Sequence, residues 1–178
     1  MKITDSGAKK RAGNIKLVIM DVDGVMTDGR IVIDDNGVES KFFHVRDGHG
    51  IKLLIRAGVR VAIITGRESH VVSRRARELG IDHVSQGVIE KAKRTREIIE
   101  ELGLLPKEVA FIGDDLIDIP AMRIVGLAAA VADSVPEVKK FAHIITENGG
   151  GKGAVREVCE YILKAKRLWE EITEKYLK

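Results

Sequence analysis

The chain contains one cysteine, three prolines and few aromatic residues, and these scarcities exclude several classes of protein. A single cysteine, Cys159, cannot form a disulfide framework and is typical of a reducing compartment. No apolar run approaches the roughly 18 residues of a membrane span, and the polar N-terminus lacks the apolar segment of a signal peptide. We therefore expect a cytoplasmic protein that does not enter a membrane.

Aromatic residues are also missing from the two basic clusters, Lys9–Arg11 and Arg74–Arg77. The net charge is only +3, with acidic and basic residues interspersed along the chain. Clusters of this kind are typical of solvated faces rather than of nucleic-acid grooves. We expect no nucleic-acid partner.

The 178 residues are 44% apolar, which is enough for one domain with a sizeable core. Short β-rich runs alternate with helical patterns, which predicts a single α/β domain over 1–178 with a Rossmann-like, doubly wound parallel sheet. The predicted strands are Lys16–Met20, Arg60–Ile64, His83–Ser85, Val109–Ile112, Leu127–Val131 and His143–Ile145. The predicted helices are Gly50–Arg56, Ser69–Leu79, Lys91–Leu102, Leu116–Ile124 and a long helix from about Ala154 to Tyr176.

Two segments depart from this alternation. Residues 30–43 contain two short β-rich runs around Asp34-Asp35-Asn36-Gly37, which predicts a β-hairpin directly after the first strand. Residues 149–178 begin with a glycine-rich strap and continue as the terminal helix. We expect deletion of 149–178 to disturb turnover or assembly more than it unfolds the core.

The most informative residues are Asp21 and Asp23, which directly follow the apolar run Lys16–Met20. Side chains two positions apart on an extended chain point to the same side, so the two carboxylates could face one reacting centre. A sheet core cannot shelter two like charges without a partner. A hard cation at the end of the strand is the partner that we expect.

Polar residues follow three further strands, at the edge where open α/β sheets bind their ligands. They are Thr65, Gly66 and Arg67 after the second strand, Lys91 after the third, and Asp114, Asp115 and Asp118 after the fourth. These residue types suit phosphoryl transfer, because one carboxylate can attack phosphorus and another can protonate the departing oxygen. Mg²⁺ suits an all-oxygen site, whereas zinc is not expected because no His or Cys cluster has ligand spacing.

These residues resemble the four motifs of the haloacid dehalogenase-like phosphatases. The resemblance covers about residues 15–163, and within the superfamily the chain is similar to members without a cap domain that act on phosphorylated sugar acids. The segments that carry it are Asp21–Asp28, Val45–Gly48, Ile64–Arg67, Lys91, Gly113–Asp118 and Gly149–Glu157.

The resemblance implies a role for each acidic residue. Asp21 would be the nucleophile, and Asp23 would be the general acid and base. Mg²⁺ would be held by the carboxylates of Asp21 and Asp114 and by the backbone carbonyl of Asp23. Asp115 and Asp118 would support these ligands.

The resemblance also implies how the substrate is bound. Thr65 and Lys91 would hold the transferred phosphoryl group, with Gly66 against the substrate, while Arg46 and Arg67 would contact the sugar acid. The expected substrate is 3-deoxy-D-manno-octulosonate 8-phosphate (KDO 8-phosphate). A nonulosonic acid 9-phosphate or another small phosphosugar is the alternative.

Since the chain has no room for a cap domain, the resemblance implies a homotetramer in which hairpins join at the centre and neighbouring subunits complete each site. The strap Gly149–Gly153 would reach a neighbour's site, or would simply be a loop before the last helix. Lys152 occupies a position where the family pattern would have arginine.

Two other functions compete with the phosphatase hypothesis. A phospho-acceptor signalling receiver also uses Asp, Thr and Lys at strand ends, but its acceptor lies on the third strand, where this chain has no Asp. A non-catalytic subunit of a sugar-nucleotide synthetase is the second alternative. It is disfavoured because every catalytic position is occupied.

Overall fold

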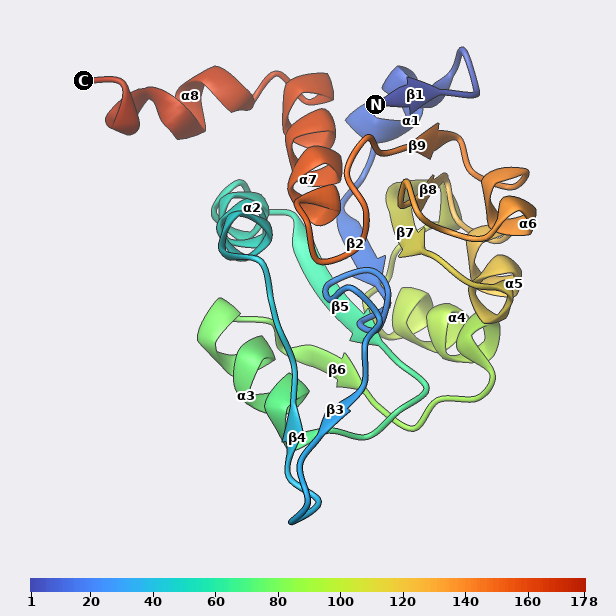
Figure 1. Ribbon diagram of the computed structural model, residues 1–178. Coiled ribbons are helices and arrows are strands. Elements are labelled where there is room, and N and C mark those ends of the chain that lie inside the picture. The colour runs from blue at the N-terminus through green and yellow to red at the C-terminus, as the bar shows by residue number, and fades with distance from the viewer.

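The computed structural model describes residues 1–178 and shows a seven-stranded sheet between two layers of helices (Figure 1). The sheet order is β1-β9-β8-β7-β2-β5-β6, and every pairing is parallel except that of β1 with β9. The strands are β1 (Lys2–Ile3), β2 (Leu17–Met20), β5 (Arg60–Ile64), β6 (His83–Ser85), β7 (Val109–Gly113), β8 (Leu127–Ala130) and β9 (Ile144–Ile145). The predicted doubly wound α/β fold is confirmed, and β1 is the strand that the sequence patterns did not indicate.

Both faces of the sheet are covered by helices, so its strands are apolar on both sides. In β2, for example, Val18 and Met20 face one layer and Leu17 and Ile19 face the other. The first layer contains α1 (Ala8–Gly13), α2 (Val45–Arg56), α3 (His70–Leu79) and α7 (Ala154–Ala165). The second contains α4 (Lys91–Glu101), α5 (Ile119–Met122) and α6 (Pro136–Lys139).

Helix α2 begins at Val45, earlier than the predicted start at Gly50. Gly48 and Gly50 weaken the helical pattern in the sequence, but both are required by close packing. A Cβ on Gly50 would lie 3.2 Å from the Cα of Arg156 in α7. The glycines therefore let α2 approach its neighbours.

The predicted helix Leu116–Ile124 is instead a 3₁₀ turn, η2 (Leu116–Asp118), followed by α5. The Asp118 carboxylate accepts hydrogen bonds from the backbone N–H groups of Asp114 and Asp115. These bonds tighten the chain after β7. A second short 3₁₀ turn, η1 (Pro106–Glu108), leads into β7.

The single long helix predicted for Ala154–Tyr176 is wrong. Helix α7 ends at Ala165, Arg167 adopts a left-handed φ of 61°, and the chain continues as α8 (Trp169–Thr173) and η3 (Glu174–Tyr176). The break lets Leu168 and Ile172 turn back onto the core, although no glycine or proline marks it. Because α7 itself is largely buried, deletion of 149–178 would remove part of the core, contrary to our expectation.

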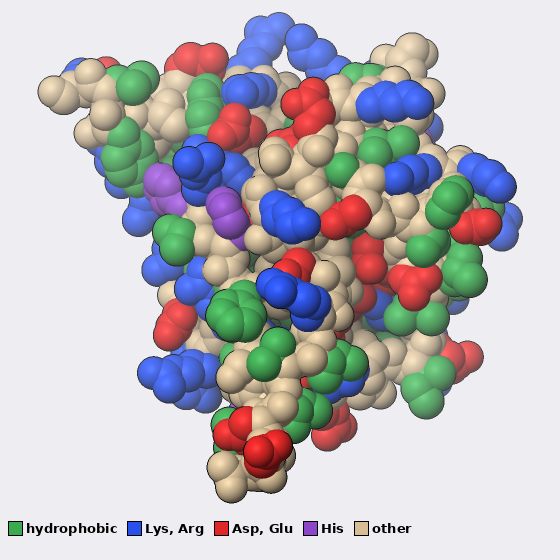
Figure 2. Space-filling model, viewed as in Figure 1, with side chains coloured by type: hydrophobic (Ala, Val, Ile, Leu, Met, Phe, Trp, Pro, Cys, Tyr) green, Lys and Arg blue, Asp and Glu red, His purple; other side chains and the backbone are tan.

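The predicted hairpin is present as β3 (Val32–Ile33) and β4 (Glu39–Ser40), which pair with each other and not with the main sheet. It projects from the domain below the carboxyl ends of the central strands (Figure 1). Hydrophobic side chains gather over its surface (Figure 2). Ile31, Ile33, Val38 and Phe42 are all more than half exposed.

Candidate active site

Three strand ends converge at the candidate site. Strand β2 lies between β5 and β7, with Met20 opposite Ile63 on one side and Ile112 on the other. Asp21 and Thr65 therefore follow adjacent strands, and Asp114 follows the last residue of β7. The sheet order, which no local sequence pattern shows, brings these residues to one edge.

A buried lysine connects the acidic residues. Lys91 is the first residue of α4, and its side chain is fully buried. Its Nζ lies 2.8 Å from Asp21 Oδ2 and 2.6 Å from Asp118 Oδ1. Because an ammonium is buried at such a position only with charged partners, the two carboxylates explain how Lys91 is accommodated.

Burial and mutual repulsion change the acidity of this cluster. Burial raises the pKa of Asp21 to about 6, although Lys91 opposes the shift. Burial, followed by repulsion from Asp118 and Asp21, raises the pKa of Asp114 to about 8. For Lys91, burial acts to lower the pKa, but the carboxylates of Asp118 and Asp21 outweigh it and the pKa is raised.

The cluster fits a divalent cation. Carboxylate oxygens of Asp21, Asp114 and Asp118 lie within 4.8 Å of one another. With all three carboxylates ionised, the single ammonium would leave two negative charges uncompensated. Asp21 Oδ1 and Asp114 Oδ1 are buried without a hydrogen-bond partner, whereas both oxygens of Asp118 already accept hydrogen bonds. The donor set therefore offers Asp21 and Asp114 as ligands and Asp118 as the residue that orients them.

Gly24 makes room for this arrangement. It has a φ of +92°, and a Cβ at this position would lie 2.1 Å from Asp114 Oδ2. Any larger residue would both strain the backbone and displace the carboxylate. The glycine that follows Asp23 is thus part of the site.

The other predicted residues lie around the cluster. The side chain of Asp23 contacts Lys41, whose Nζ lies 2.5 Å from Asp23 Oδ1. Thr65 is buried at the end of β5, and Gly66 and Arg67 are exposed just beyond it. Arg67 Nε is 3.8 Å from Asp23 Oδ2, which places the guanidinium beside this carboxylate.

Arg46 and Asp115 are not brought into the cluster. Arg46 is exposed on the first turn of α2 and lines a polar hollow with His44, Lys152 and Arg156. Asp115 is exposed, and its carboxylate accepts the backbone N–H of Leu116 at 2.7 Å. We expected both Asp115 and Asp118 to support the metal ligands. In this structure, only Asp118 of the two contacts Lys91 and the backbone of Asp114.

The strap is held by its own chain. Gly151 N donates to Val25 O at 3.0 Å, and Gly150 N donates to Asp133 Oδ1 at 2.9 Å. A Cβ on Gly150 would lie 1.8 Å from the carbonyl oxygen of Gly24. Glycine is therefore required here for close backbone approach, so the strap packs against the loop that carries Asp21 and Asp23.

Sequence reasoning missed Lys41 and Glu39. Glu39 accepts from Arg67 Nη2 at 3.2 Å and from the hydroxyl of Ser69, and it lies 3.3 Å from Lys41 Nζ. The sequence did contain one indication, the two-residue spacing of Glu39 and Lys41, since residues two apart point to the same side of an extended strand. Without the fold, nothing showed that this side faces Asp23.

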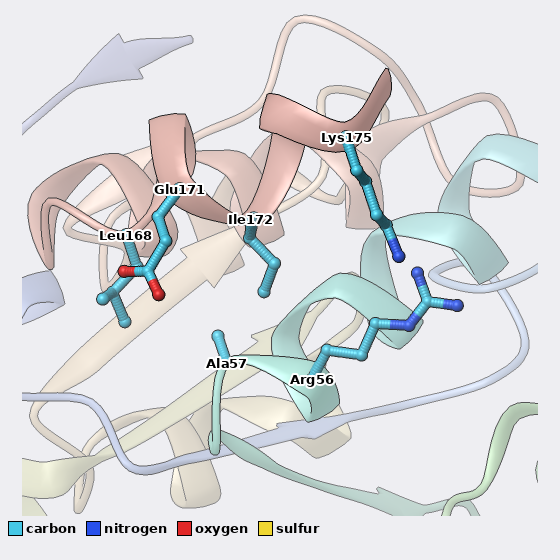
Figure 3. Close-up of a pocket in the computed structure, with 6 residues that line it drawn as sticks. All are labelled: Arg56, Ala57, Leu168, Glu171, Ile172 and Lys175. Carbon is cyan, nitrogen blue, oxygen red and sulfur yellow. The ribbon is translucent and has the colours of Figure 1, made fainter. Parts of the chain in front are cut away.

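A separate hollow lies between α2 and the C-terminal segment (Figure 3). It is lined by Arg56, Ala57, Leu168, Glu171, Ile172 and Lys175. Because α2 ends here, just before β5 begins, the hollow lies toward the amino ends of the strands. It is therefore distinct from the acidic cluster.

The chain is similar to a family of hydrolases and to phosphatases within it. A family model for haloacid dehalogenase-like hydrolases matches residues 45–126. KdsC of Yersinia pestis, a 3-deoxy-D-manno-octulosonate 8-phosphate phosphatase, is 50% identical over 92% of this chain and 88% of its own length. KdsC of Escherichia coli K12 is 47% identical over 90% of this chain and 86% of its own length.

A solved structure resembles the chain over nearly its whole length. The 3-deoxy-D-manno-octulosonate 8-phosphate phosphatase of Moraxella catarrhalis, in complex with magnesium, phosphate and KDO, has a TM-score of 0.94 and 41% identity. The match covers 95% of this chain and 97% of that one. The chain belongs to the haloacid dehalogenase-like hydrolase family. Within that family, the chain is similar to the KdsC phosphatases.

Proposed function

We propose that this protein is a Mg²⁺-dependent phosphatase that hydrolyses KDO 8-phosphate to KDO and phosphate. The observation that carries the proposal is the buried cluster of Asp21, Asp114, Asp118 and Lys91 at the carboxyl ends of adjacent strands. The substrate follows from the KdsC relatives and from the KDO bound to the Moraxella catarrhalis enzyme. The phosphatase relatives favour an enzyme over a signalling receiver.

The first half of the reaction transfers the phosphoryl group to the protein. An oxygen of Asp21 attacks phosphorus, the bond from phosphorus to the ester oxygen breaks, and Asp23 gives that oxygen a proton. Lys91 and Thr65 bind the phosphoryl oxygens, and Lys91 also keeps Asp21 in place. The chemistry that Mg²⁺ supplies, when bound by Asp21 and Asp114, is neutralisation of phosphoryl charge.

The second half releases phosphate. Water loses a proton to Asp23 and attacks the phosphorus of the aspartyl phosphate, and the bond to Asp21 breaks. Asp23 is then protonated and Asp21 is again a carboxylate, so each group returns to its starting state. The two carboxylates divide nucleophilic attack and proton transfer between them.

The exposed hairpin supports a homotetramer in the same proposal. Its surface side chains Ile31, Ile33, Val38 and Phe42 would be covered if hairpins from several chains joined. Neighbouring subunits would then bring Arg46 or Lys152, which line a polar hollow of their own chain, toward a substrate's carboxylate. A cytoplasmic location is part of the proposal and is compatible with the single, buried Cys159. None of the helices has the length and apolarity needed to span a membrane.

A phosphate-release screen tests the function. The purified protein is assayed with Mg²⁺ against KDO 8-phosphate, nonulosonic acid 9-phosphates and common sugar phosphates. We expect the highest kcat/KM for KDO 8-phosphate and no release after chelation of the metal. A nonulosonic acid 9-phosphate preferred by at least about tenfold, equivalent to 1.4 kcal/mol in transition-state binding, would reassign the substrate.

A further inference from the structure

Lys41 is the one basic side chain of the hairpin that is directed into the domain and withdrawn from solvent. Its side chain is 1% exposed, and it reaches Asp23 Oδ1 at 2.5 Å. The contact joins residues 18 positions apart, on the loop after β2 and on the second arm of the hairpin. An ammonium this well buried is retained only where carboxylates compensate its lost hydration.

Lys41 also contacts a second carboxylate, that of Glu39. Glu39 lies 3.3 Å from its Nζ and is anchored by Arg67 and by the hydroxyl of Ser69. These anchors lie in the segment between β5 and α3, so they do not depend on the hairpin. The ammonium therefore has a fixed place relative to the strand ends.

The two carboxylate oxygens of Asp23 have different partners. Oδ1 is bound by Lys41, whereas Oδ2 has only the long 3.8 Å approach of Arg67. A carboxylate with one oxygen fixed has a defined plane. Its second oxygen then has a defined direction from which to exchange a proton.

We propose that Lys41 is a positioning residue that holds Asp23 in the orientation needed to protonate the leaving alkoxide. The inference rests on the proposed phosphatase function and extends it, because it gives Lys41 of the hairpin a role in orienting the general acid. In the step concerned, the bond between phosphorus and the ester oxygen breaks while the proton of Asp23 moves from Oδ2 to that oxygen. The alcohol leaves, and Asp23 becomes a carboxylate paired with Lys41.

Leaving-group dependence distinguishes positioning from a structural role. A sugar alkoxide needs the proton, but p-nitrophenolate is stable as an anion and does not. The parameter kcat/KM reports on steps up to the first irreversible one, the transfer to Asp21. It is therefore insensitive to the later role of Asp23 in activating water.

The experiment compares wild type with Lys41→Met, Lys41→Arg and Lys16→Met. Lys16 is a matched control, because it also forms an ion pair, at 2.6 Å with Glu108, but lies at the opposite end of β2. For Lys41→Met we expect kcat/KM to fall about 100-fold on KDO 8-phosphate and less than about fivefold on p-nitrophenyl phosphate. Lys41→Arg should recover part of the loss, and Lys16→Met should leave the ratio of the two values unchanged.

Equal losses on both esters in a folded Lys41→Met protein, or no loss on either, would overturn the proposal. If this variant does not fold, as judged by circular dichroism, Lys41→Gln is subjected to the same comparison. Failure of the proposed function would appear in the wild type instead, as no release from KDO 8-phosphate. In that case, the comparison of variants would use the alkyl phosphate that the wild type does hydrolyse in place of KDO 8-phosphate. A wild type that is inactive on every ester would overturn both proposals.

Discussion

At the scale of single residues, the site combines charges that would each be unfavourable alone. Lys91 is surrounded by Asp21 and Asp118, and it compensates only part of their charge once Asp114 is included. The raised pKa values of Asp21 and Asp114, about 6 and about 8, express the excess of negative charge in a buried place. A divalent ion bound by the free oxygens would remove that excess.

Asp21→Asn tests the nucleophile. The amide keeps the size of the side chain but cannot attack phosphorus, and it is a poorer metal ligand. We expect Mg²⁺-dependent phosphate release to fall by at least about 10⁴-fold, while the thermal unfolding midpoint stays near that of the wild type. Asp35→Asn, at the exposed hairpin tip, is the matched control and should keep full activity. Substantial turnover by well-folded Asp21→Asn would contradict the assignment.

Several candidate site residues could be proposed from the sequence because they lie next to apolar strands along the chain. Asp21 and Asp23 are two positions apart at the end of an apolar run, and Asp114 follows another such run. The role of Asp118 was less accessible. Its contacts with Lys91 and with the backbone after β7 depend on how a later turn folds back.

At the scale of elements, the hairpin has two distinct sides. Glu39 and Lys41 point toward the strand ends, whereas Ile33 and Val38 are more than half exposed. A two-stranded ribbon of this length is marginal by itself in water. Its contacts with Asp23 and Arg67, and the association that we propose, would both stabilise it.

Ile33→Asp tests the association of the hairpins. A charge at this exposed apolar position would have to be buried in an assembly, at a cost of several kcal/mol, but should not affect the separate chain. We expect size-exclusion chromatography with light scattering to show a tetramer for wild type and a smaller species for Ile33→Asp. Asp35→Lys, at the polar tip, is the control for a change of charge on the same hairpin.

Both variants should still fold, as judged by circular dichroism, because Ile33 is in neither core cluster and Asp35 is exposed at the hairpin tip. A wild-type protein that elutes as a monomer at micromolar concentration would refute the tetramer. Ile33→Asp that remains tetrameric would show that another surface joins the subunits.

The bounds of the six predicted strands of the main sheet were correct to within one residue, because the central ones are short apolar runs covered on both faces. Strand β1 was not indicated, and the hairpin strands are shorter than the predicted runs. Arg60–Ile64 and His83–Ser85 were predicted with the observed bounds. The C-terminal helix was not, since the apolar spacing continues past Ala165 while the chain bends at Arg167. The bend is stabilised by long-range contacts, including Lys166 Nζ with the carbonyl of Ile15 at 2.9 Å.

At the scale of the whole molecule, metal binding should be linked to folding. The cluster exists only when β2, β7 and α4 are assembled, so Mg²⁺ binds the folded chain and not the unfolded one. At about 100 times its Kd, a ligand of this kind stabilises by about 2.7 kcal/mol. For a chain of this size, we expect the unfolding midpoint to rise by about 5–10 °C on adding Mg²⁺.

Differential scanning calorimetry with Mg²⁺ and with a chelator measures this shift. Asp114→Asn should reduce it strongly, because one ligand and one charge are lost. The same shift in Asp114→Asn as in wild type would place the ion elsewhere. Asp115→Asn, whose side chain only accepts the N–H of Leu116 in this structure, serves as the comparison.

The stabilisation of the folded chain by Mg²⁺ should increase with pH. In the metal-free folded chain, the pKa values of Asp21 and Asp114 lie above their ordinary value of 3.8, at about 6 and about 8. Their contribution to the free energy of unfolding is therefore complete below about pH 4 and is lost as the pH rises to about 8. The stabilisation by Mg²⁺ should grow over the same interval, because protons no longer compete for the carboxylates.

The sequence alone determined the apolar strands, the alternation of helices and strands, and the kind of chemistry that its strand ends can support. Each of these depends on residues that are close along the chain. Only the tertiary structure decided that β2 lies between β5 and β7, that Lys91 is buried between Asp21 and Asp118, and that the hairpin directs Lys41 at Asp23. These contacts join distant residues, so they are set by how the whole core packs and not by any local pattern.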